Sequence, residues 1–363
     1  MMRPPQFQTG VFQQRLIRWF EKNRRTLPWR RTRDPYRILV SEFMLQQTQV
    51  TTVLKYYPRF LRRFPTVRKL ADAPRDAVMK AWEGLGYYNR AHSLHRLAQA
   101  VTREHGGRIP GDPAVLSSLP GVGRYTCGAV LSMAFGRRVP ALDGNVIRVL
   151  ARLFRITDNV DQADTRNRLW LLAESLLPRG RIREFNEGLM ELGATVCTPK
   201  QPSCSSCPVS RACAAYAHAV QDELPIRTPR RPLPHVDVTA GVIWKNGRLL
   251  ITRRPPKGLL GGLWEFPGGK RERGETLGQC LAREIREELG IRVVVGRHLV
   301  SVNHAYSHFK ITLHVFHCRF LSGRVRCLSG CDAARWISVK SIGRYALPGA
   351  DRKAIELLKE DAK

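Results

Sequence analysis

The sequence predicts a multi-domain protein in which an all-α domain is followed by a smaller mixed α/β domain. A chain of 363 residues is longer than one hydrophobic core normally supports, so about two domains are expected. From about Phe12 to Tyr216, apolar residues recur at spacings of three and four between short glycine turns, which predicts helices. Beyond residue 236 the pattern changes to short β-rich runs with one helix, which predicts a separate α/β domain.

The predicted domain limits follow from a change in composition. The helical domain is expected to span residues 1–217, a linker residues 218–235, and the second domain residues 236–363. Prolines alternate with arginines in the linker, and this composition favours extended chain over a packed element. The prolines are Pro225, Pro229, Pro232 and Pro234.

Two local signals define the second domain. Asn246 and Gly247 separate two β-rich runs, and this dipeptide is a strong signal for a β-hairpin. A helix is expected at about Thr276 to Leu289, where apolar residues again recur at helical spacing.

The charge of the chain indicates a polyanionic partner. Lysine and arginine total 61 against 30 aspartates and glutamates, giving a formal net charge of +31, and nucleic acid is the leading candidate to balance it. The alternative is an arginine-rich composition bias in a protein that does not contact DNA. Residues 1–10 have no signal-peptide core, and no apolar run has the length of a membrane span, so a cytoplasmic, nucleoid-associated monomer is expected.

Four of the nine cysteines lie close together in the sequence. Their pattern is C-x6-C-x2-C-x5-C, and they are Cys197, Cys204, Cys207 and Cys213. Four thiolates are what a [4Fe-4S] cluster requires, whereas structural zinc sites usually bring two tight cysteine pairs and this segment has one. A [4Fe-4S] cluster is therefore favoured over zinc, and free core cysteines are the third alternative.

A glycine turn in "LPGVGRY" is placed between two predicted helices. Gly121 and Gly123 would let the backbone approach a phosphate, and N–H groups of the helix that starts near Tyr125 would meet its charge. The segment resembles a helix-hairpin-helix motif. The alternative is an ordinary corner between two helices.

Two carboxylates are predicted to lie in different surroundings. Glu42 lies four residues after Ile38 and three before Leu45, so a helix aligns it with apolar neighbours, which should raise its pKa. Asp143 precedes a predicted helix and is expected to be its N-cap, where the helix dipole favours the anion. One acid and one anion are the pair needed to break a glycosidic bond through an oxocarbenium-like transition state.

Five segments in order, together with the cysteine spacing, resemble the MutY family of adenine DNA glycosylases within the endonuclease III superfamily. They are "SEFMLQQTQV", "GLGYYNRA", "LPGVGRYT", "VPALDGNVIRVLAR", "FNEGLMELGATVCTP" and the cysteine cluster. The resemblance implies removal of adenine mispaired with 8-oxoguanine or guanine in double-stranded DNA. Glu42 would protonate the purine and Asp143 would stabilise the sugar cation.

The resemblance also implies roles for other residues. Tyr125 and Asn145 would support Asp143, and Glu187 would position groups near the leaving base. Three residues would enter the base stack, although the last of them is equally explained as a core aromatic: Gln47, Leu85 and Tyr87.

The residue directly after this glycine turn distinguishes two types of glycosylase reaction. Sister enzymes that nick the DNA backbone have a lysine directly after this "GVGR", and this sequence has Tyr125. A phenol cannot form a Schiff base, so a monofunctional glycosylase is expected.

The segment "GKRERGETLGQCLAREIREELG" fits the Nudix pattern at every fixed position. These positions are Gly269, Glu275, Arg283, Glu284, Ile285, Glu287, Glu288, Gly290 and Ile291. Glu284, Glu287 and Glu288 share one helical face, where Mg²⁺ would balance their charge beside a diphosphate. The domain resembles MutT, and in the MutY family the equivalent domain reads 8-oxoguanine but typically has a degraded acidic set. Here the set is intact.

Three interpretations of this domain remain open. It is a lesion reader, with Tyr306, Ser307 and His308 in the loop that contacts 8-oxoguanine, or it also hydrolyses oxidised nucleoside triphosphates with Mg²⁺. The third interpretation is a solvated acidic helix whose charges Arg283 and Arg286 offset. For the whole chain, the rival hypotheses are a Nudix hydrolase with a DNA-docking helical domain and a non-catalytic DNA-binding protein.

Overall fold

The protein was analysed as a computed structural model, which describes residues 7–229, 232–306 and 309–361. The chain forms two compact units. The first contains Met1–Ala71 and Arg96–Arg230, and the second contains Asp72–His95 and Arg231–Lys363. The second unit thus includes the segment Asp72–His95 as well as the C-terminal part of the chain. The predicted domain limits at residues 217 and 236 remain a prediction.

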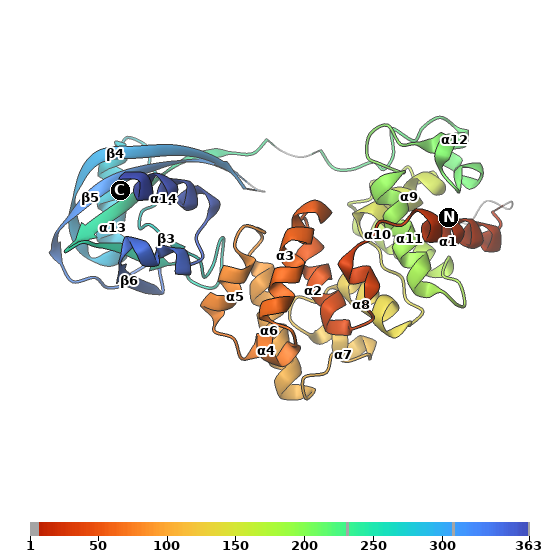
Figure 1. Cartoon of the computed structure of the whole chain (residues 1–363). Helices are drawn as coiled ribbons and strands as arrows, with labels where there is room; N and C mark the ends of the chain where they lie inside the picture. The colour runs from red at the N-terminus through yellow and green to blue at the C-terminus, as the bar shows by residue number, and fades with distance from the viewer. Residues whose placement is uncertain (1–6, 230–231, 307–308, 362–363) are drawn as a thin grey trace. The chain divides into compact units, whose positions relative to one another are not determined.

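In residues 7–71 and 96–229 every regular element is a helix, as predicted for this part of the chain (Figure 1). The α-helices are α1 (Thr9–Asn23), α2 (Pro35–Leu45), α3 (Val50–Arg63), α4 (Val67–Ala71), α6 (Asn89–Glu104), α7 (Pro113–Ser118), α8 (Arg124–Phe135), α9 (Gly144–Leu153), α10 (Ala163–Ser175), α11 (Ile182–Thr195) and α12 (Ala214–Ala217). Three short 3-10 helices complete the set: η1 (Pro28–Arg31), η2 (Cys204–Ser206) and η3 (Ser210–Ala212).

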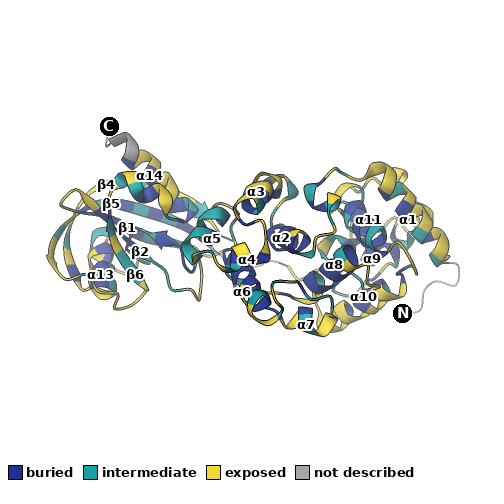
Figure 2. Cartoon of the chain, turned by 60° about the horizontal axis from the view of Figure 1, so that its bottom comes forward, coloured by how far each residue is buried: buried dark blue, intermediate teal, exposed yellow. Residues whose placement is uncertain are grey.

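Helix α2 is a core helix because its apolar residues surround the axis. Its N-cap is Asp34, whose side chain accepts hydrogen bonds from the backbone N–H groups of Tyr36 and Arg37, and Pro35 is the first residue of the helix. Residues 38–44 are all buried, and Figure 2 shows the helix in dark blue among its neighbours. A helix that is apolar on all sides is stable only inside a core, so its one carboxylate is buried with it.

The second unit is built on a mixed sheet. Its strands are β1 (His235–Lys245), β2 (Arg248–Arg253), β3 (Trp264–Glu265), β4 (Ile291–Ala305), β5 (Lys310–Gly323) and β6 (Ala333–Ile337). The order is β3-β2-β1-β5-β4, with β6 also paired to β2, and among the described strands the β1–β5 pair alone is parallel. The helices of this unit are α5 (Arg75–Trp82), α13 (Leu277–Leu289), η4 (Val339–Arg344) and α14 (Gly349–Asp361).

The two local signals in this unit are confirmed. Asn246 and Gly247 have φ angles of 49° and 70° and connect β1 to β2 as an antiparallel hairpin. Helix α13 begins after Thr276, which forms a capping box with Gln279, and ends at Gly290 in the left-handed conformation.

Helices cover both faces of the sheet because neighbouring strand residues point in opposite directions. On β2, Leu250 packs with Ile285 of α13 in one core cluster. Leu249 and Ile251 pack with residues of α14, including Ala354, in another. The result is a three-layer α/β/α arrangement within this unit.

The linker is less free than its composition predicted. In its first part, Val160 donates its backbone N–H to the carbonyl of Ile226 at 3.0 Å, and Arg227 donates to Asp161 at 2.9 Å. Thr228 also donates its backbone N–H to Asp161, at 3.1 Å. These bonds hold residues 226–228 against the first unit, which proline and arginine content alone does not reveal.

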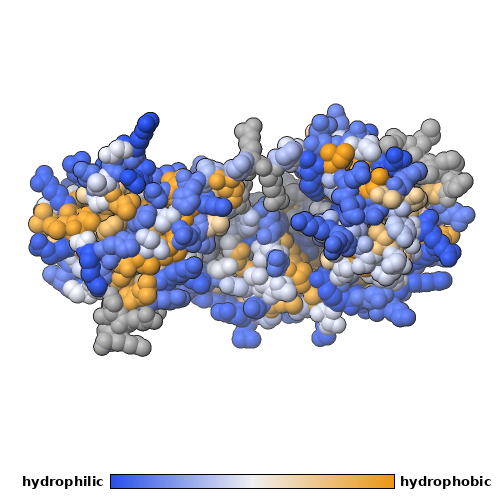
Figure 3. All heavy atoms as spheres, turned by 90° about the horizontal axis from the view of Figure 1, so that it is seen from above, coloured by the Kyte–Doolittle hydropathy of each residue, from blue (hydrophilic) through white to orange (hydrophobic). Residues whose placement is uncertain are grey.

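Figure 3 shows hydrophilic residues over most of the face that it presents. Within the described residues, none of the helices has the combination of length and apolar composition that a membrane span requires.

Candidate functional site

Glu42 is a buried acid with one dedicated hydrogen-bond donor. Its residue is 3% exposed, and the hydroxyl of Tyr125 donates to its Oε2 at 2.6 Å. Burial raises the pKa of Glu42 to about 7, while the bond from Tyr125 and the charge of Arg30 oppose the rise and the charges of Asp143 and Glu187 add to it. The sequence prediction of a desolvated carboxyl on an apolar helix agrees with this geometry.

Asp143 is the N-cap of α9, as the sequence predicted. Its Oδ1 accepts from the backbone N–H of Val146 at 2.7 Å, and its Oδ2 accepts from Nδ2 of Asn145 at 2.8 Å. Burial raises the pKa of Asp143, and these hydrogen bonds oppose the rise. The position at a helix N-terminus therefore does not by itself set the pKa, because desolvation acts in the opposite direction.

The structure pairs Tyr125 differently from what the resemblance implied. Asn145 supports Asp143, but the hydroxyl of Tyr125 donates to Glu42. Tyr125 lies in the first turn of α8, and α8 packs against α2, the helix that carries Glu42. Burial is the main cause that raises the pKa of both Glu42 and Tyr125, and the charge of Asp143 adds to the rise in each.

Glu187 is also buried and is paired with an arginine. Nε of Arg183 donates to Glu187 Oε1 at 3.1 Å, one helical turn away on α11. Burial raises the pKa of Glu187, and the charges of Arg183 and Arg30 oppose the rise. Beside them is a cavity of about 240 Å³, lined by Arg24, Arg30, Arg31, Thr32, Arg33, Arg183, Glu184 and Glu187. Arg183 was not singled out from the sequence, although its i,i+4 spacing to Glu187 was a usable signal.

Two further residues that sequence reasoning missed hold Asn145. A Cβ atom placed on Gly193 would lie 2.6 Å from Cβ of Asn145, so glycine is needed where α11 meets α9. Nη2 of Arg148 donates to Oδ1 of Asn145 at 2.9 Å and to the carbonyl of Gly193 at 2.7 Å. The sequence carries no signal for the contacts of Gly193, because they join α9 to α11, whereas the bond from Arg148 to Asn145 has the i,i+3 spacing of one helix.

The four clustered cysteines are half-buried, and three of them pack against the helical core: Cys197, Cys207 and Cys213. Buried Arg152 donates to Sγ of Cys197 at 3.3 Å and to the carbonyls of Thr198 and Pro199. In the described part of the chain, no three histidine, cysteine or acidic side chains converge as ligands of a single metal ion. A four-iron cluster does not require such convergence, because each cysteine binds a different iron.

The candidate DNA-contacting residues differ in exposure. Gln47 and Tyr87 are exposed and adopt φ angles of 56° and 48°, which are uncommon for residues other than glycine. Tyr87 is 40% exposed, so its explanation as a core aromatic is wrong. Leu85 is only 5% exposed, and the expectation that it enters a base stack is not met by this conformation, because a wedge must project from the surface.

The glycine turn between α7 and α8 has the expected form. Gly121 has φ 78°, and Gly123 is the N-cap of α8 with open space where a side chain would lie. The backbone N–H of Cys127 begins the helical bonding to Gly123 at 2.9 Å. Gly123 and Arg124 are both exposed at the start of α8, which is where an anion site at a helix N-terminus would lie.

The Nudix signature is organised around Arg283. This guanidinium donates to both oxygens of Glu275, at 2.8 and 3.1 Å, and to Glu284 and Glu287, each at 3.1 Å. A Cβ atom on Gly269 would lie 2.2 Å from Cδ of Glu284, so a side chain at this position would displace that carboxyl group. Arg283 thus offsets part of the acidic charge, as the solvated-helix interpretation expected.

Glu288 lies among other carboxylates. Burial raises its pKa to about 8, and the charges of Glu265 and Glu284 add to the rise. Arg254 donates to both oxygens of Glu265, at 3.0 and 2.9 Å, and opposes it. In the residues that the structure describes, the acidic residues do not form a preorganised site for one ion.

The proposed lesion-reading loop is only partly described. Tyr306 follows β4, and its ring packs against His304 and Phe309 at centroid distances of 4.7 and 5.1 Å. Ser307 and His308 lie outside the described residues. The structure therefore shows a half-buried aromatic at the start of this loop.

Comparison with known proteins assigns both parts of the chain. Residues 40–175 match the family described as HhH-GPD superfamily base excision DNA repair protein, and residues 239–357 match the NUDIX domain family. The adenine DNA glycosylase of Rattus norvegicus is 34% identical over 96% of this chain and 78% of the relative. The Homo sapiens adenine DNA glycosylase is 35% identical over 96% of this chain and 74% of the relative.

Two solved structures resemble the chain in fold. A thermostable thymine-DNA glycosylase superposes with a TM-score of 0.53 at 35% identity, covering 58% of this chain and 97% of that chain. An endonuclease III trapped as a covalent intermediate with DNA superposes with a TM-score of 0.51 at 22% identity, covering 59% of this chain and 99% of that chain. The second likeness concerns the fold alone.

The full-length relatives match the helical part and the Nudix part in one continuous alignment, which neither a glycosylase domain nor a Nudix domain alone would give. The predicted family and fold class are confirmed by these matches. The chain belongs to the adenine DNA glycosylase family of base excision repair enzymes, with an HhH-GPD domain followed by a Nudix domain.

Proposed function

We propose that this chain hydrolyses the N-glycosidic bond of adenine mispaired with 8-oxoguanine or guanine in double-stranded DNA. The observation that carries the proposal is Glu42, a buried carboxyl with a pKa raised to about 7 and a hydrogen bond from Tyr125. The names of the curated relatives supply adenine as the base, and the net charge of +31 supports DNA as the partner.

The chemistry follows from the two carboxyl groups. Protonated Glu42 gives its proton to a ring nitrogen of the extruded adenine, so the electron pair of the C1′–N9 bond leaves with a neutral base. The sugar becomes an oxocarbenium ion, which ionised Asp143 stabilises until water adds to C1′ and loses a proton. Asn145 holds Asp143 in place, and Glu187 contributes to positioning groups near the base.

The absence of a lysine at position 125 supports a monofunctional enzyme. A Schiff base needs an amine, and Tyr125 instead uses its hydroxyl to bind Glu42. Borohydride should therefore trap little covalent DNA complex. Trapping as efficient as that of a lysine-dependent lyase would contradict this assignment.

We also propose that Cys197, Cys204, Cys207 and Cys213 hold a [4Fe-4S] cluster. Two observations support this proposal: Cys197, Cys207 and Cys213 pack against the same helical core cluster, and Cys204 lies in the same segment between them. When bound, the cluster would cross-link this loop as a structural element. Purified protein should be brown, with visible absorption and about four irons per chain, whereas a colourless zinc protein would exclude the cluster.

The excision proposal is tested by single-turnover release of adenine from a duplex containing A:8-oxoguanine. Glu42→Gln and Asp143→Asn should each slow release by at least about a hundredfold. Asp112→Asn is the matched control, because Asp112 caps α7 through the N–H of Val115 as Asp143 caps α9. Normal rates in both site variants would reject the proposal.

For the second unit we propose lesion reading and, as a second activity, Mg²⁺-dependent hydrolysis of oxidised nucleoside triphosphates. The clustering of Glu284, Glu287 and Glu288 on α13 favours the hydrolase. Burial raises the pKa of Glu288 to about 8 and the charges of Glu265, Glu284 and Glu287 add to the rise, so a bound cation would stabilise its ionised form. Release of pyrophosphate from 8-oxo-dGTP should require Mg²⁺ and disappear in Glu287→Gln. Glu272→Gln is the control, because its side chain is 72% exposed. No turnover by the wild type would leave the reader role alone.

The reader role has its own test. Tyr306→Leu should reduce the preference for A:8-oxoguanine over A:G in single-turnover excision, because an aromatic ring at the start of the loop would no longer contact the lesion. The rate on A:G should stay close to that of the wild type. An unchanged preference would contradict the role of Tyr306.

A further inference from the structure

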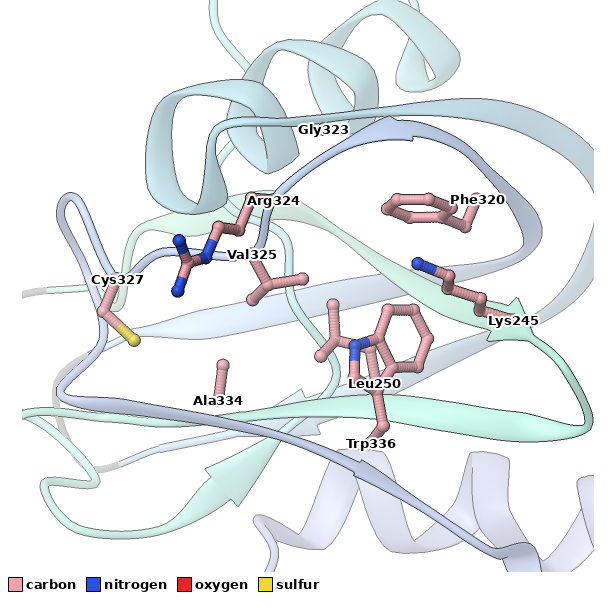
Figure 4. A pocket seen from close by; sticks show the side chains of 9 residues that line it. All are labelled: Lys245, Leu250, Phe320, Gly323, Arg324, Val325, Cys327, Ala334 and Trp336. Atoms are coloured by element: carbon pink, nitrogen blue, oxygen red, sulfur yellow. The ribbon is translucent and has the colours of Figure 1, made fainter.

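A second pocket lies in the Nudix unit, at the end of the sheet where β1 and β5 terminate. Its volume is about 550 Å³, within the range of small-molecule sites. Figure 4 shows the side chains that line it, from β1, β2, β5, β6 and the segment after β5. The lining residues are Lys245, Leu250, Phe320, Gly323, Arg324, Val325, Cys327, Ala334 and Trp336.

Two aromatic rings and an apolar floor form the walls. Phe320 and Trp336 pack edge to face, with centroids 5.9 Å apart and an interplanar angle of 85°. Leu250 is fully buried beneath them, and all three belong to the core cluster that includes α13. The rings are therefore fixed in place by the core while remaining half-exposed in the pocket. Planar aromatic ligands bind well against such rings.

All formal charge in the lining is positive. Nζ of Lys245 lies 4.1 Å from the centroid of the Phe320 ring, so a cation is held directly beside an aromatic wall. Arg324 provides the second cation, at the other end of the pocket in Figure 4. Among the described residues, neither cation has a carboxylate within ion-pair distance, and no acidic residue lines the pocket. Both charges are thus available to an anionic ligand.

We propose that this pocket binds a nucleotide unit, with its base against Phe320 and Trp336 and its phosphate at Lys245 or Arg324. The size, the aromatic walls and the two cations each match one part of such a ligand. The unit could come from a free nucleoside monophosphate or from a DNA strand, and both sources present the same chemistry.

The pocket is separate from the Nudix carboxylates. None of its lining residues belongs to the signature from Gly269 to Ile291. Cys327 of the pocket is followed by Leu328, whose backbone N–H donates to the carbonyl of Glu288 at 2.8 Å. A backbone hydrogen bond therefore connects the segment that lines the pocket to the Nudix helix. The inference is also independent of base excision, since the catalytic residues proposed above all belong to the first unit.

The test is calorimetric titration of the full chain with dGMP in buffer without divalent cations. Saturable binding is expected, and the double variant Lys245→Ala/Arg324→Ala should weaken it by at least about tenfold, because charge-assisted phosphate contacts are lost. Deoxyguanosine and inorganic phosphate should each bind at least about tenfold more weakly than dGMP. The matched control is Arg292→Ala/Arg319→Ala, which removes two exposed cations from β4 and β5 outside the pocket.

A measurement on the wild type avoids dependence on the variants. Cys327 is exposed and lines the pocket, so saturating dGMP should slow its alkylation by iodoacetamide at least about threefold, followed by peptide mass spectrometry. The same ligand should leave this rate unchanged in Lys245→Ala/Arg324→Ala. Thermal melting of each variant checks that it is folded.

A phosphate-containing pentanucleotide distinguishes the two sources. If DNA is the occupant, the difference in affinity between the wild type and Lys245→Ala/Arg324→Ala will be larger for the pentanucleotide than for dGMP. If a free nucleotide is the occupant, the difference will be larger for dGMP. The proposal is overturned if dGMP does not bind saturably, if the double variant binds it normally, or if Cys327 is not protected.

Discussion

Arg148 is joined to Cys197 by a hydrogen bond of 2.7 Å from its Nε to the Cys197 carbonyl. The same guanidinium donates to Oδ1 of Asn145, whose amide in turn donates to Asp143. One side chain on α9 therefore connects the first residue of the cysteine cluster to the proposed stabiliser of the sugar cation.

This connection predicts the behaviour of Arg148→Met. The variant should slow single-turnover adenine release by about ten- to a hundredfold, because Asn145 and Asp143 lose a fixed position. Its iron content and visible absorption should stay near those of the wild type, since no cysteine is changed. Arg168→Met, which removes a surface ion pair with Asp158, is the control. A full rate in Arg148→Met would show that the connection does not position the carboxylate.

The pH dependence of excision should report Glu42. Because burial raises its pKa to about 7, the protonated acid predominates below pH 7 and is depleted above it. The single-turnover rate on saturating duplex should fall about tenfold for each pH unit above this value. Tyr125→Phe removes a hydrogen bond that lowers the pKa of Glu42, so its inflection should move to higher pH. A flat profile, or a shift to lower pH, would exclude Glu42 as the proton donor.

Gly193→Ala should impair excision without a mutation at any reacting group. The added Cβ atom would meet Asn145 at 2.6 Å, and the backbone of both helices limits how far either can move. A rate loss of at least about tenfold is expected from displacement of Asn145 and Asp143. Gly180→Ala is the matched control, because its added methyl group meets nothing within 4 Å. Equal rates for the two variants would mean that α9 adapts freely.

Glu191→Gln should destabilise the first unit. The Glu191 side chain is fully buried and accepts from Arg25 at 2.7 Å and Arg30 at 2.8 Å, so the substitution leaves two cations without a charged partner. The expected loss is about 3 kcal/mol in the free energy of unfolding by denaturant. Glu21→Gln, at an exposed ion pair with Arg181, should cost less than about 1 kcal/mol. Similar losses in both variants would contradict the importance of burial.

Lowering the pH should remove the stability that ionised Glu191 contributes in the wild type. Burial alone would raise the pKa of Glu191, but hydrogen bonds from Arg25 and Arg30 outweigh it and hold the pKa at about 2. A depressed pKa gives stability above the ordinary value of 4.5, and this stability is lost as pH falls towards 2. Denaturant titrations between pH 6 and 2 should show a steeper loss in the wild type than in Glu191→Gln.

Patterns along the chain were sufficient for local structure. Apolar spacing from Thr276 onward, and Asn246 followed by Gly247, predicted a helix and a hairpin that the structure contains, because helical periodicity and tight turns depend on neighbouring residues. The capping role of Asp143 belongs to the same class. Exposure was less well predicted, and Leu85 and Tyr87 illustrate this, since packing against distant residues determines which of two nearby apolar side chains is covered.

The sequence by itself determined the family resemblance, the two-part architecture, the acidic and basic motifs and the burial of Glu42, because each is written in local spacing and order. Only the tertiary structure decided that Tyr125 binds Glu42, that Gly193 admits Asn145 and that Arg148 reaches Cys197. These contacts join residues from different helices or, for Cys197, from a helix and the segment after α11. Their existence depends on how those helices pack, and helix packing is a property of many side chains at once.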